Sequence, residues 1–290
     1  MVAIFDYQAA ASVNEALDLL AQSGDDAKVL AGGQSLIALI NLGLARPSVL
    51  VDVSRVPELS HVHSEDGWVA IGATTRHASA IASADIQRRC PLLAEALPMI
   101  GDPQVRNRGT IGGSIAHADP AAELPTVAAC LGAMMRVQSR SSSREVAATD
   151  FFAGYLTTTL GAGELLTEVR FPAAQPGTGY AFLELVRRKG DFAIVSAAAA
   201  VGLAANGTCA HVRLALGGVG ATPIFAQEAG AALEGRAPTP DAIGEAARAA
   251  CSRIDPESDV IASAEYRRDM AEVYARRALT EAVSRALQPR

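Results

Sequence analysis

Two short glycine turns, far apart in the chain, constrain the possible folds most. Residues 31–35 read Ala-Gly-Gly-Gln-Ser, and residues 110–114 read Thr-Ile-Gly-Gly-Ser. Glycine accepts positive φ and lets a ligand approach the main chain closely, and successive N–H groups in such a turn can bind an anion without Lys or Arg. A single Gly-Gly pair more often marks a plain tight turn. Because both pairs stand beside hydroxyl side chains, we predict two backbone nests that hold the two phosphates of a pyrophosphate from opposite sides.

Composition narrows the class of protein. The chain has 290 residues, a length that favours two domains or three small ones. Its net charge of −6 and its aromatic content of 4% give no electrostatic footprint for nucleic acid and few platforms for stacking bases. No apolar run approaches the ~20 residues of a membrane span, and the first residues lack the regions of a signal peptide. We therefore expect a cytoplasmic protein with no nucleic-acid partner and no membrane span.

Cysteine and histidine spacing argues against a metal centre in this chain. Iron–sulfur clusters and structural zinc sites need grouped thiolates, but the cysteines are scattered and form no Cys-x-x-Cys. We interpret them as small buried hydrophobic side chains in a reducing compartment. His61-x-His63 alternates like a strand face, which we interpret as solvated, so no metal ligand is expected. The four cysteines are Cys90, Cys130, Cys209 and Cys251.

The first 55 residues or so predict a small α/β unit. Ser12, with Glu15 three residues later, has the form of a capping box and predicts the start of a helix. A short buried strand at 28–31 leads directly into the first glycine turn. A helix is expected over 35–44 and a further strand over 49–53.

A Pro/Gly-rich stretch at 172–179 marks the predicted domain boundary. Before it, the apolar run 121–131 fits a buried helix or a strand equally well. After it, Asn206-Gly207 is a strong hairpin signal between strand-like runs, and the pattern is helical from Gln227 onward. The predicted domains are 1–175, with subdomains of about 1–55 and 56–175, and 176–290. Other expected elements are strands at 67–72, 134–138, 164–171, 193–203 and 212–219 and a helix at 90–100.

Missing motifs exclude the commoner phosphate-binding folds. No Gly-x-x-x-x-Gly-Lys-Ser/Thr is present, which excludes a P-loop nucleotidase. A Rossmann site would need a strand-linked Gly-x-Gly-x-x-Gly with an acidic residue about 20 positions on, and this is also missing. The Gly-x-Ser-x-Gly elbow of many hydrolases is absent as well. These exclusions leave a dinucleotide held by two separate turns.

With their flanking residues, the two turns resemble those of a known family. Residues 31–36 and 44–47, Ala-Gly-Gly-Gln-Ser-Leu and Leu-Ala-Arg-Pro, are similar to the first flavin turn of the FAD-binding medium subunits of molybdenum hydroxylases, the xanthine dehydrogenase and carbon monoxide dehydrogenase family. The stretch 105–125, which contains the second turn, resembles its counterpart nearly residue for residue. The likeness covers essentially the whole chain. Shorter signatures follow in the family's order at 164–168, 188–193 and 262–268.

The resemblance implies a fold and a division of labour. The implied fold is α+β, with a two-subdomain FAD-binding domain of the vanillyl-alcohol-oxidase/PCMH type and a smaller C-terminal α+β domain. In such complexes a large subunit carries molybdopterin and oxidises the substrate, and a small subunit carries two 2Fe–2S clusters. The medium subunit receives electrons on FAD and passes them to the final acceptor. The chain is thus expected in a dimer of heterotrimers, without a catalytic residue for the substrate itself.

The same resemblance implies cofactor-binding positions. Each turn would hold one side of the pyrophosphate, and the two hydroxyl side chains of the second turn would add donors. Glu123 corresponds to an acidic residue near the ribose or adenosine part, and Phe192 to a position against the isoalloxazine. Ile100 and Leu166 correspond to apolar positions around the adenine or the flavin ring. The turn positions are Val29, Leu30, Ala31, Gly32, Gly33, Gln34, Ser35 and Leu36, and Thr110, Ile111, Gly112, Gly113 and Ser114.

The chain departs from some relatives at residues 182–184, Phe-Leu-Glu, where a lysine would lie close to the flavin. Lys189 is near in sequence but need not replace that lysine. We interpret Asp119 as a residue that orders the second turn. Arg106 and Arg108 precede that turn, a position where basic residues are more often structural or interfacial than phosphate ligands.

Two other functions remain open at this point. A stand-alone flavin oxidase or dehydrogenase of the wider fold would need a substrate cavity over the ring, and often a His or Cys bonded to FAD. A non-catalytic assembly subunit would have lost the cofactor, which the two intact glycine turns argue against. Neither the substrate of the complex nor its electron acceptor can be read from this chain.

Overall fold

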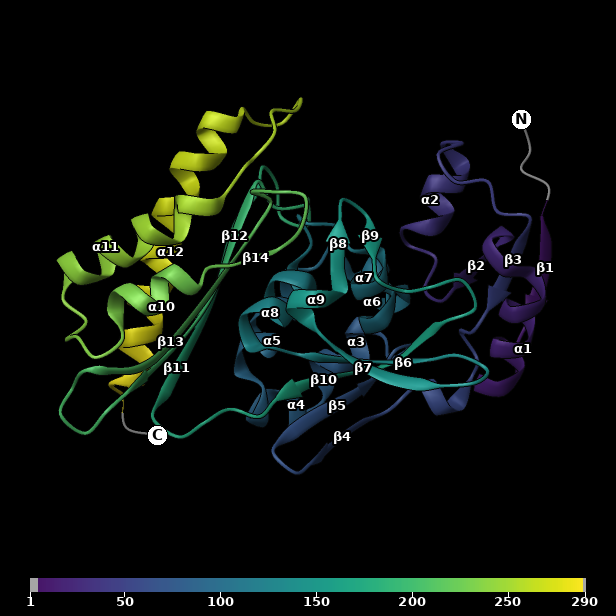
Figure 1. Ribbon diagram of the computed structural model, residues 1–290, viewed down its shortest axis with the longest axis horizontal. Coiled ribbons are helices and arrows are strands. Elements are labelled where there is room, and N and C mark those ends of the chain that lie inside the picture. Colours follow the sequence, from purple (N-terminus) through teal and green to yellow (C-terminus); the bar gives the residue numbers. More distant parts are fainter. Residues whose placement is uncertain (1–4, 289–290) are drawn as a thin grey trace.

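The computed structural model describes residues 5–288, and its three larger sheets follow one another along the long axis of the molecule (Figure 1). At the N-terminal end lies a three-stranded parallel sheet with the order β1-β3-β2. Helices connect its strands, so the sheet is built from β-α-β units. The elements are β1 (Asp6–Ala9), α1 (Val13–Ser23), β2 (Ala27–Leu30), α2 (Leu36–Asn41) and β3 (Val49–Asp52).

The middle sheet is antiparallel and has the order β4-β5-β10-β6-β7. One face carries buried side chains such as Ile71, Met135 and Val169, which share a core with the surrounding helices. Successive strand residues point to opposite faces, so the other face carries the polar side chains. The strands are β4 (Val62–Glu65), β5 (Trp68–Gly72), β6 (Met134–Gln138), β7 (Ser143–Ala147) and β10 (Leu165–Pro172), beside a short pair, β8 (Phe152–Gly154) and β9 (Thr157–Thr158).

Helices of the middle layer pack on the apolar face of this sheet and carry the second glycine turn (Figure 1). The turn lies where one short helix ends and the next begins. The helices are α3 (His77–Ala82), α4 (Ala84–Arg89), α5 (Pro91–Ala96), α6 (Pro103–Arg108), α7 (Ile111–His117), α8 (Glu123–Leu131) and α9 (Ala148–Phe151).

A four-stranded antiparallel sheet, in the order β11-β12-β13-β14, forms the C-terminal layer. Its central strand β12 is buried on both faces. Ala197 and Ala199 pack with the C-terminal helices, whereas Ala198 and Ala200 belong to the core of the middle layer. Burial on both faces explains the unbroken apolar run of this strand. The elements are β11 (Thr178–Leu185), β12 (Val195–Leu203), β13 (Cys209–Gly217), β14 (Ile224–Phe225), α10 (Gln227–Leu233), α11 (Pro240–Ala250) and α12 (Ala264–Ala286).

Local signals in the sequence are confirmed where they are specific. Ser12 Oγ accepts a hydrogen bond from the Glu15 N–H at 3.2 Å, and the Glu15 carboxylate accepts one from the Ala11 N–H at 2.7 Å, at the start of α1. Asn206 and Gly207, with Gly207 at φ +80°, lie in the hairpin between β12 and β13. The ambiguous run 121–131 is helical over α8, which is buried along most of its length, as expected for a helix that is apolar all round.

Several expected elements differ in extent. The helix expected over 35–44 covers only 36–41, because the chain turns at Gly43 with φ +72°. Residues 254–263 interrupt the helical C-terminal region, and Pro256, which lacks an N–H, lies in that interruption. Strands β7 and β11 were not expected, and β4 was indicated only by the strand-like alternation of His61 and His63. Strand β11 begins inside the Pro/Gly-rich stretch, so its first residues have a turn-like composition.

Among residues 5–288, none of the helices combines the length and the apolar character that crossing a bilayer requires.

Candidate functional site: two glycine turns in contact

The two glycine turns meet through their main chains. A Cβ built on Gly32 would lie 2.2 Å from the carbonyl oxygen of Arg108 and 2.9 Å from the Cα atom of Gly109. Position 32 therefore accepts only glycine without a shift of backbone. Gly109 immediately precedes the second turn. The N-terminal layer and the middle layer thus touch at the residues that the sequence predicts for pyrophosphate binding.

The first turn presents a row of backbone donors. It joins β2, which contains Val29 and Leu30, to α2, which begins at Leu36. Gly33 has φ +75°, a conformation that L side chains rarely adopt. In the described part of the chain, the N–H groups of residues 32–35 have no hydrogen-bond acceptor, and Ser35 makes no side-chain capping bond. Such a row of unpaired N–H groups is an anion-binding surface.

Thr110 caps the helix that follows the second turn. Its Oγ1 accepts a hydrogen bond from the Gly113 N–H at 3.1 Å, and its carbonyl accepts one from the Ser114 N–H at 3.1 Å. A Cβ on Gly113 would lie 2.6 Å from Thr110 Oγ1, so glycine leaves room for this cap. The arrangement is a typical N-cap.

The remaining amides of the second turn also have acceptors within the chain. The Ile111 N–H donates to the Thr75 carbonyl at 2.9 Å, and the Gly112 N–H donates to the Ala73 carbonyl at 2.8 Å. A Cβ on Gly112 would meet the Ala73 side chain at 2.4 Å, so this glycine is needed for packing. The second turn can therefore offer a ligand its hydroxyl groups and a backbone that can be approached closely. The amides without an acceptor are those of the first turn.

Of the three apolar candidates for contacts with the cofactor, two are buried in the core and one is exposed. Ile100 and Leu166 are buried in the core of the middle layer. Phe192, by contrast, is 56% exposed and lies in the loop between β11 and β12. That loop packs on the middle layer close to Ile100, because a Cβ on Gly190 would lie 3.0 Å from the carbonyl oxygen of Gly101.

Burial raises the pKa of two carboxyl groups that lie close enough to interact, Glu123 and Glu184. Glu123, the first residue of α8, is only 5% exposed, and burial raises its pKa from 4.5 to about 8, with further contributions from the charges of Glu184 and Asp119. Burial also raises the pKa of Glu184, on β11, to about 7. Among residues 5–288, Glu184 Oε2 has no hydrogen-bond partner. A protonated carboxyl group can donate a hydrogen bond, so this pair offers polar contacts without adding two negative charges.

The polar residues around the second turn are structural. Arg106 donates to the carbonyls of Ile100 and Gly101, both at 2.8 Å, and so holds the preceding loop. Asp119 accepts a hydrogen bond from the Ala121 N–H at 2.9 Å and orders the turn after α7. Arg108, in contrast, is exposed, and so is Lys189.

Sequence reasoning missed three polar residues that are buried or partly buried. Glu184 was noted only because it lies in the stretch where some relatives have a lysine. No local motif indicates that its carboxyl group is partly buried. Burial lowers the pKa of His77 to about 4, so its imidazole is neutral. The backbone N–H of His77 donates to the Gly109 carbonyl at 3.0 Å. Buried Arg267 on α12 donates to the carbonyl of Ile194 at 2.6 Å. In the sequence, Arg267 was marked only as part of the family signature at 262–268.

The donor set fits the pyrophosphate of a dinucleotide such as FAD. Unpaired amides at the first turn would share the phosphate charge, as dipoles do in anion sites that lack Lys or Arg. The missing Cβ of Gly32 lets the second turn lie directly against them. Glu184 Oε2, buried without a partner, leaves a polar group for a ligand to satisfy.

Family models match both parts of the chain. The model of the FAD binding domain in molybdopterin dehydrogenase matches residues 3–174, and that of the CO dehydrogenase flavoprotein C-terminal domain matches residues 180–282.

Curated relatives match nearly the whole length. The chain is 44% identical over 282 residues to the 6-hydroxypseudooxynicotine dehydrogenase complex subunit alpha of Paenarthrobacter nicotinovorans, which covers 97% of this chain and 95% of the relative. It is 41% identical over 281 residues to the carbon monoxide dehydrogenase medium chain of Hydrogenophaga pseudoflava, with 97% and 98% covered.

Solved structures agree. The carbon monoxide dehydrogenase of Hydrogenophaga pseudoflava superposes with a TM-score of 0.95 and 42% identity, covering 98% of this chain and 99% of that one. Quinoline 2-oxidoreductase from Pseudomonas putida 86 gives a TM-score of 0.92 with 38% identity and 98% of each chain covered. With matches of this extent, the chain belongs to the family of FAD-binding medium subunits of the molybdenum hydroxylases.

Proposed function

We propose that this chain takes electrons from a subunit with 2Fe–2S clusters and passes them through FAD to an external acceptor. Its partners would be that small subunit and a large molybdopterin subunit, in a cytoplasmic dimer of heterotrimers. We also propose that residues 1–175 form the flavin-binding domain and residues 176–290 the C-terminal domain. Substrate oxidation would belong to the large subunit.

One observation carries the flavin part of this proposal. The unpaired amides of residues 32–35 belong to the turn whose Gly32 contacts Arg108 and Gly109, so donors from one layer lie beside the start of the second turn. A pyrophosphate placed there would be bound from both layers.

Each candidate then has a role that its environment supports. Residues 29–36 would supply backbone donors, and residues 110–114 would supply hydroxyls and close approach. Glu123, protonated at neutral pH, would donate a hydrogen bond to the sugar or adenosine part. Ile100 and Leu166 would form apolar walls, and exposed Phe192 would shield one edge of the ring. Bound FAD supplies the redox chemistry, while the protein positions and tunes it.

The variant Gly32→Ala tests the contact. Its Cβ would lie 2.2 Å from a backbone oxygen, so the two turns must separate and flavin should be lost. The matched control is Gly244→Ala, a buried helical glycine whose Cβ would meet only the end of the Arg248 side chain at 3.7 Å. We expect the ratio of flavin to protein after gel filtration to fall in the first variant alone. Equal flavin content in both variants would contradict the proposed site.

The electron path needs a separate measurement on the whole complex, co-purified with its partners. The clusters are first reduced with dithionite. We then expect a dye acceptor to reoxidise the 2Fe–2S clusters, monitored by their spectroscopic signals, far more slowly in the Gly32→Ala complex than in the Gly244→Ala complex. Equal rates would show that electrons leave without FAD. Acid precipitation distinguishes the stand-alone oxidase, because a covalent flavin would leave the pellet yellow.

A further inference from the structure

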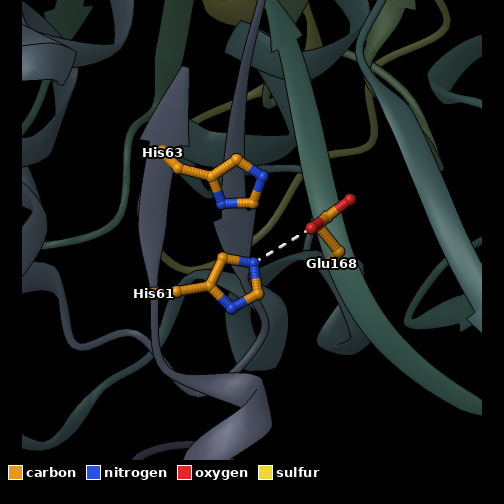
Figure 2. Close-up of side chains that lie close together, drawn as sticks. All are labelled: His61, His63 and Glu168. Carbon is orange, nitrogen blue, oxygen red and sulfur yellow. Dashed lines mark hydrogen bonds and ion pairs between the residues drawn. The ribbon is translucent and has the colours of Figure 1, made fainter. Parts of the chain in front are cut away.

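The polar face of the middle sheet holds a compact cluster of three metal-ligating side chains, opposite the face on which the helices pack. His61 and His63 point from one edge of the sheet toward Glu168 on β10 (Figure 2). One ligand atom from each of the three lies within 4.8 Å of the other two. We propose that these residues form a binding site for one Zn²⁺ ion or a divalent transition metal of the same class.

Small residues on the intervening strand make this cluster possible. His61 lies opposite Gly72 of β5, and Gly72 in turn lies opposite Glu168 of β10. Strands two apart in a sheet are about 9.6 Å from each other, so side chains can meet across the middle strand only if it leaves room. A Cβ on Gly72 would lie 2.8 Å from His61 Nδ1 and would displace the ring. Ala70 plays the same part beside His63.

The hydrogen bonds of His61 prepare its other nitrogen for a cation. Nδ1 lies 3.1 Å from the carbonyl oxygen of Glu58, which can only accept, so Nδ1 carries the proton. In the neutral ring, Nε2 then carries a lone pair and is an acceptor, yet it faces another acceptor, Glu168 Oε2, at 3.0 Å. A metal ion bound by both atoms would satisfy these two acceptors. A ring N–H bonded to a backbone carbonyl is also the usual support of a metal-bound histidine.

Glu168 is oriented in the same way. It is buried, and its Oε1 lies 3.4 Å from Arg136 Nη1, which leaves Oε2 to face the two imidazoles. The guanidinium fixes the carboxylate but also adds a positive charge nearby, so we expect a single monodentate carboxylate ligand and a moderate affinity.

The ligand set selects the class of metal. Two imidazoles and one carboxylate, with further positions open to water, form a set that Zn²⁺ uses in open sites. Mg²⁺ and Ca²⁺ prefer oxygen ligands alone. Ligand atoms around tetrahedral Zn²⁺ lie about 3.4 Å apart. The 3.0 Å separation of His61 Nε2 and Glu168 Oε2 must therefore widen slightly, and any longer separation within the 4.8 Å cluster must shorten. His63 can supply movement, because its side chain is 45% exposed and its ion pair with Glu65 is long, at 3.6 Å.

The test is calorimetric titration of the full chain, flavin-loaded and freed of metal by a chelator, with ZnCl₂. All proteins carry Cys251→Ser, which removes the most accessible thiol. We expect one saturable site, with affinity at least about tenfold lower in His61→Ala, His63→Ala and Glu168→Gln. The variant His211→Ala, which removes a histidine from the C-terminal layer, serves as the control and should bind normally.

Anomalous diffraction at the zinc edge, from crystals of the otherwise unmodified chain soaked in ZnCl₂, gives a second readout that does not depend on the folding of a variant. A peak between the two imidazoles and Glu168 supports the site. A wild-type chain without saturable binding, or binding that survives both histidine variants, would overturn the proposal and leave His61 and Glu168 as a hydrogen-bonded pair.

Discussion

At the scale of single residues, the buried carboxyl group of Glu123 has the clearest consequence. Its pKa, about 8 in the folded chain against 4.5 ordinarily, means that the folded protein keeps a proton that the unfolded chain releases. The folded state is therefore favoured below pH 4.5 and loses that advantage as the pH rises through 8. Glu184, with its pKa raised to about 7, acts in the same direction.

The variant Glu123→Gln should remove most of this dependence. An amide of similar shape has no proton to lose, so we expect it to be more stable than the wild type at pH 8.5, by roughly a few kcal/mol. At pH 4.5 the two proteins should be nearly equal. Thermal unfolding of the flavin-free chains across this range measures the difference. Parallel stability curves for the two proteins would show that Glu123 ionises normally in the fold.

At the scale of turns and strands, the glycines of the two turns have separable tasks. Gly33→Val should abolish flavin retention, because its backbone has φ +75° and a Cβ would lie 3.2 Å from Ile37. Gly113→Val should do so by displacing the Thr110 cap. In both, the C-terminal layer should stay folded, as protection of the β12 and β13 amides from hydrogen exchange would show.

The matched control is Gly177→Val. Gly177 has φ +70° but no atom within 4 Å of its Cβ position, so the backbone strain is similar and the site is untouched. We expect this variant to lose stability yet to keep its flavin. Flavin loss in the control as well would mean that retention reports general destabilisation and not the turn itself.

Features set by neighbouring residues were predictable, and those set by distant ones were not. The capping box at Ser12 and the hairpin at Asn206-Gly207 depend on a few consecutive residues, and both are confirmed. Strand β4 was indicated only by the alternation of His61 and His63, and its bounds could not be predicted from four residues of mixed polarity. The contact of Gly32 with Arg108 and the approach of His61 to Glu168 join segments that only the completed sheets bring together.

The family resemblance predicted more of the site than local sequence patterns did, because members of a family share a fold and therefore the same long-range contacts. It named the flavin turns and the candidate residues around them. It did not show that the amides of Ile111 and Gly112 are occupied within the chain, since acceptors from residues 73–75 decide that. Nor could it show that Glu123 and Glu184 share one buried region, because they lie on different layers.

At the scale of the whole molecule, one ion pair joins the last helix to the middle layer. Arg285 on α12 pairs with both carboxylate oxygens of Glu95 on α5, at 2.7 and 2.9 Å. Glu95 also accepts a hydrogen bond from the Phe182 N–H at 3.1 Å. The same arginine contacts Glu281, four residues before it on its own helix, at 2.8 Å. Glu95 thus connects three elements, whereas Glu281 supports one.

Glu95→Ala should lower the free energy of unfolding by about 2 kcal/mol, because it removes charge-assisted bonds and leaves the Phe182 N–H unpaired. Glu281→Ala, which loses a partly exposed pair within one helix, should cost about 0.5 kcal/mol. Urea unfolding of the two variants measures both. Equal costs would mean that the layers are held by their apolar cores alone.

The junction at Gly32 also dictates when the nucleotide can be captured. The first turn leaves the ribosome long before Arg108 and Gly109, and the contact between the two turns forms only when the first two layers have docked. If FAD binds at the proposed site, its uptake is therefore a late step of folding. A subunit that contains flavin is one in which the first two layers have already docked correctly.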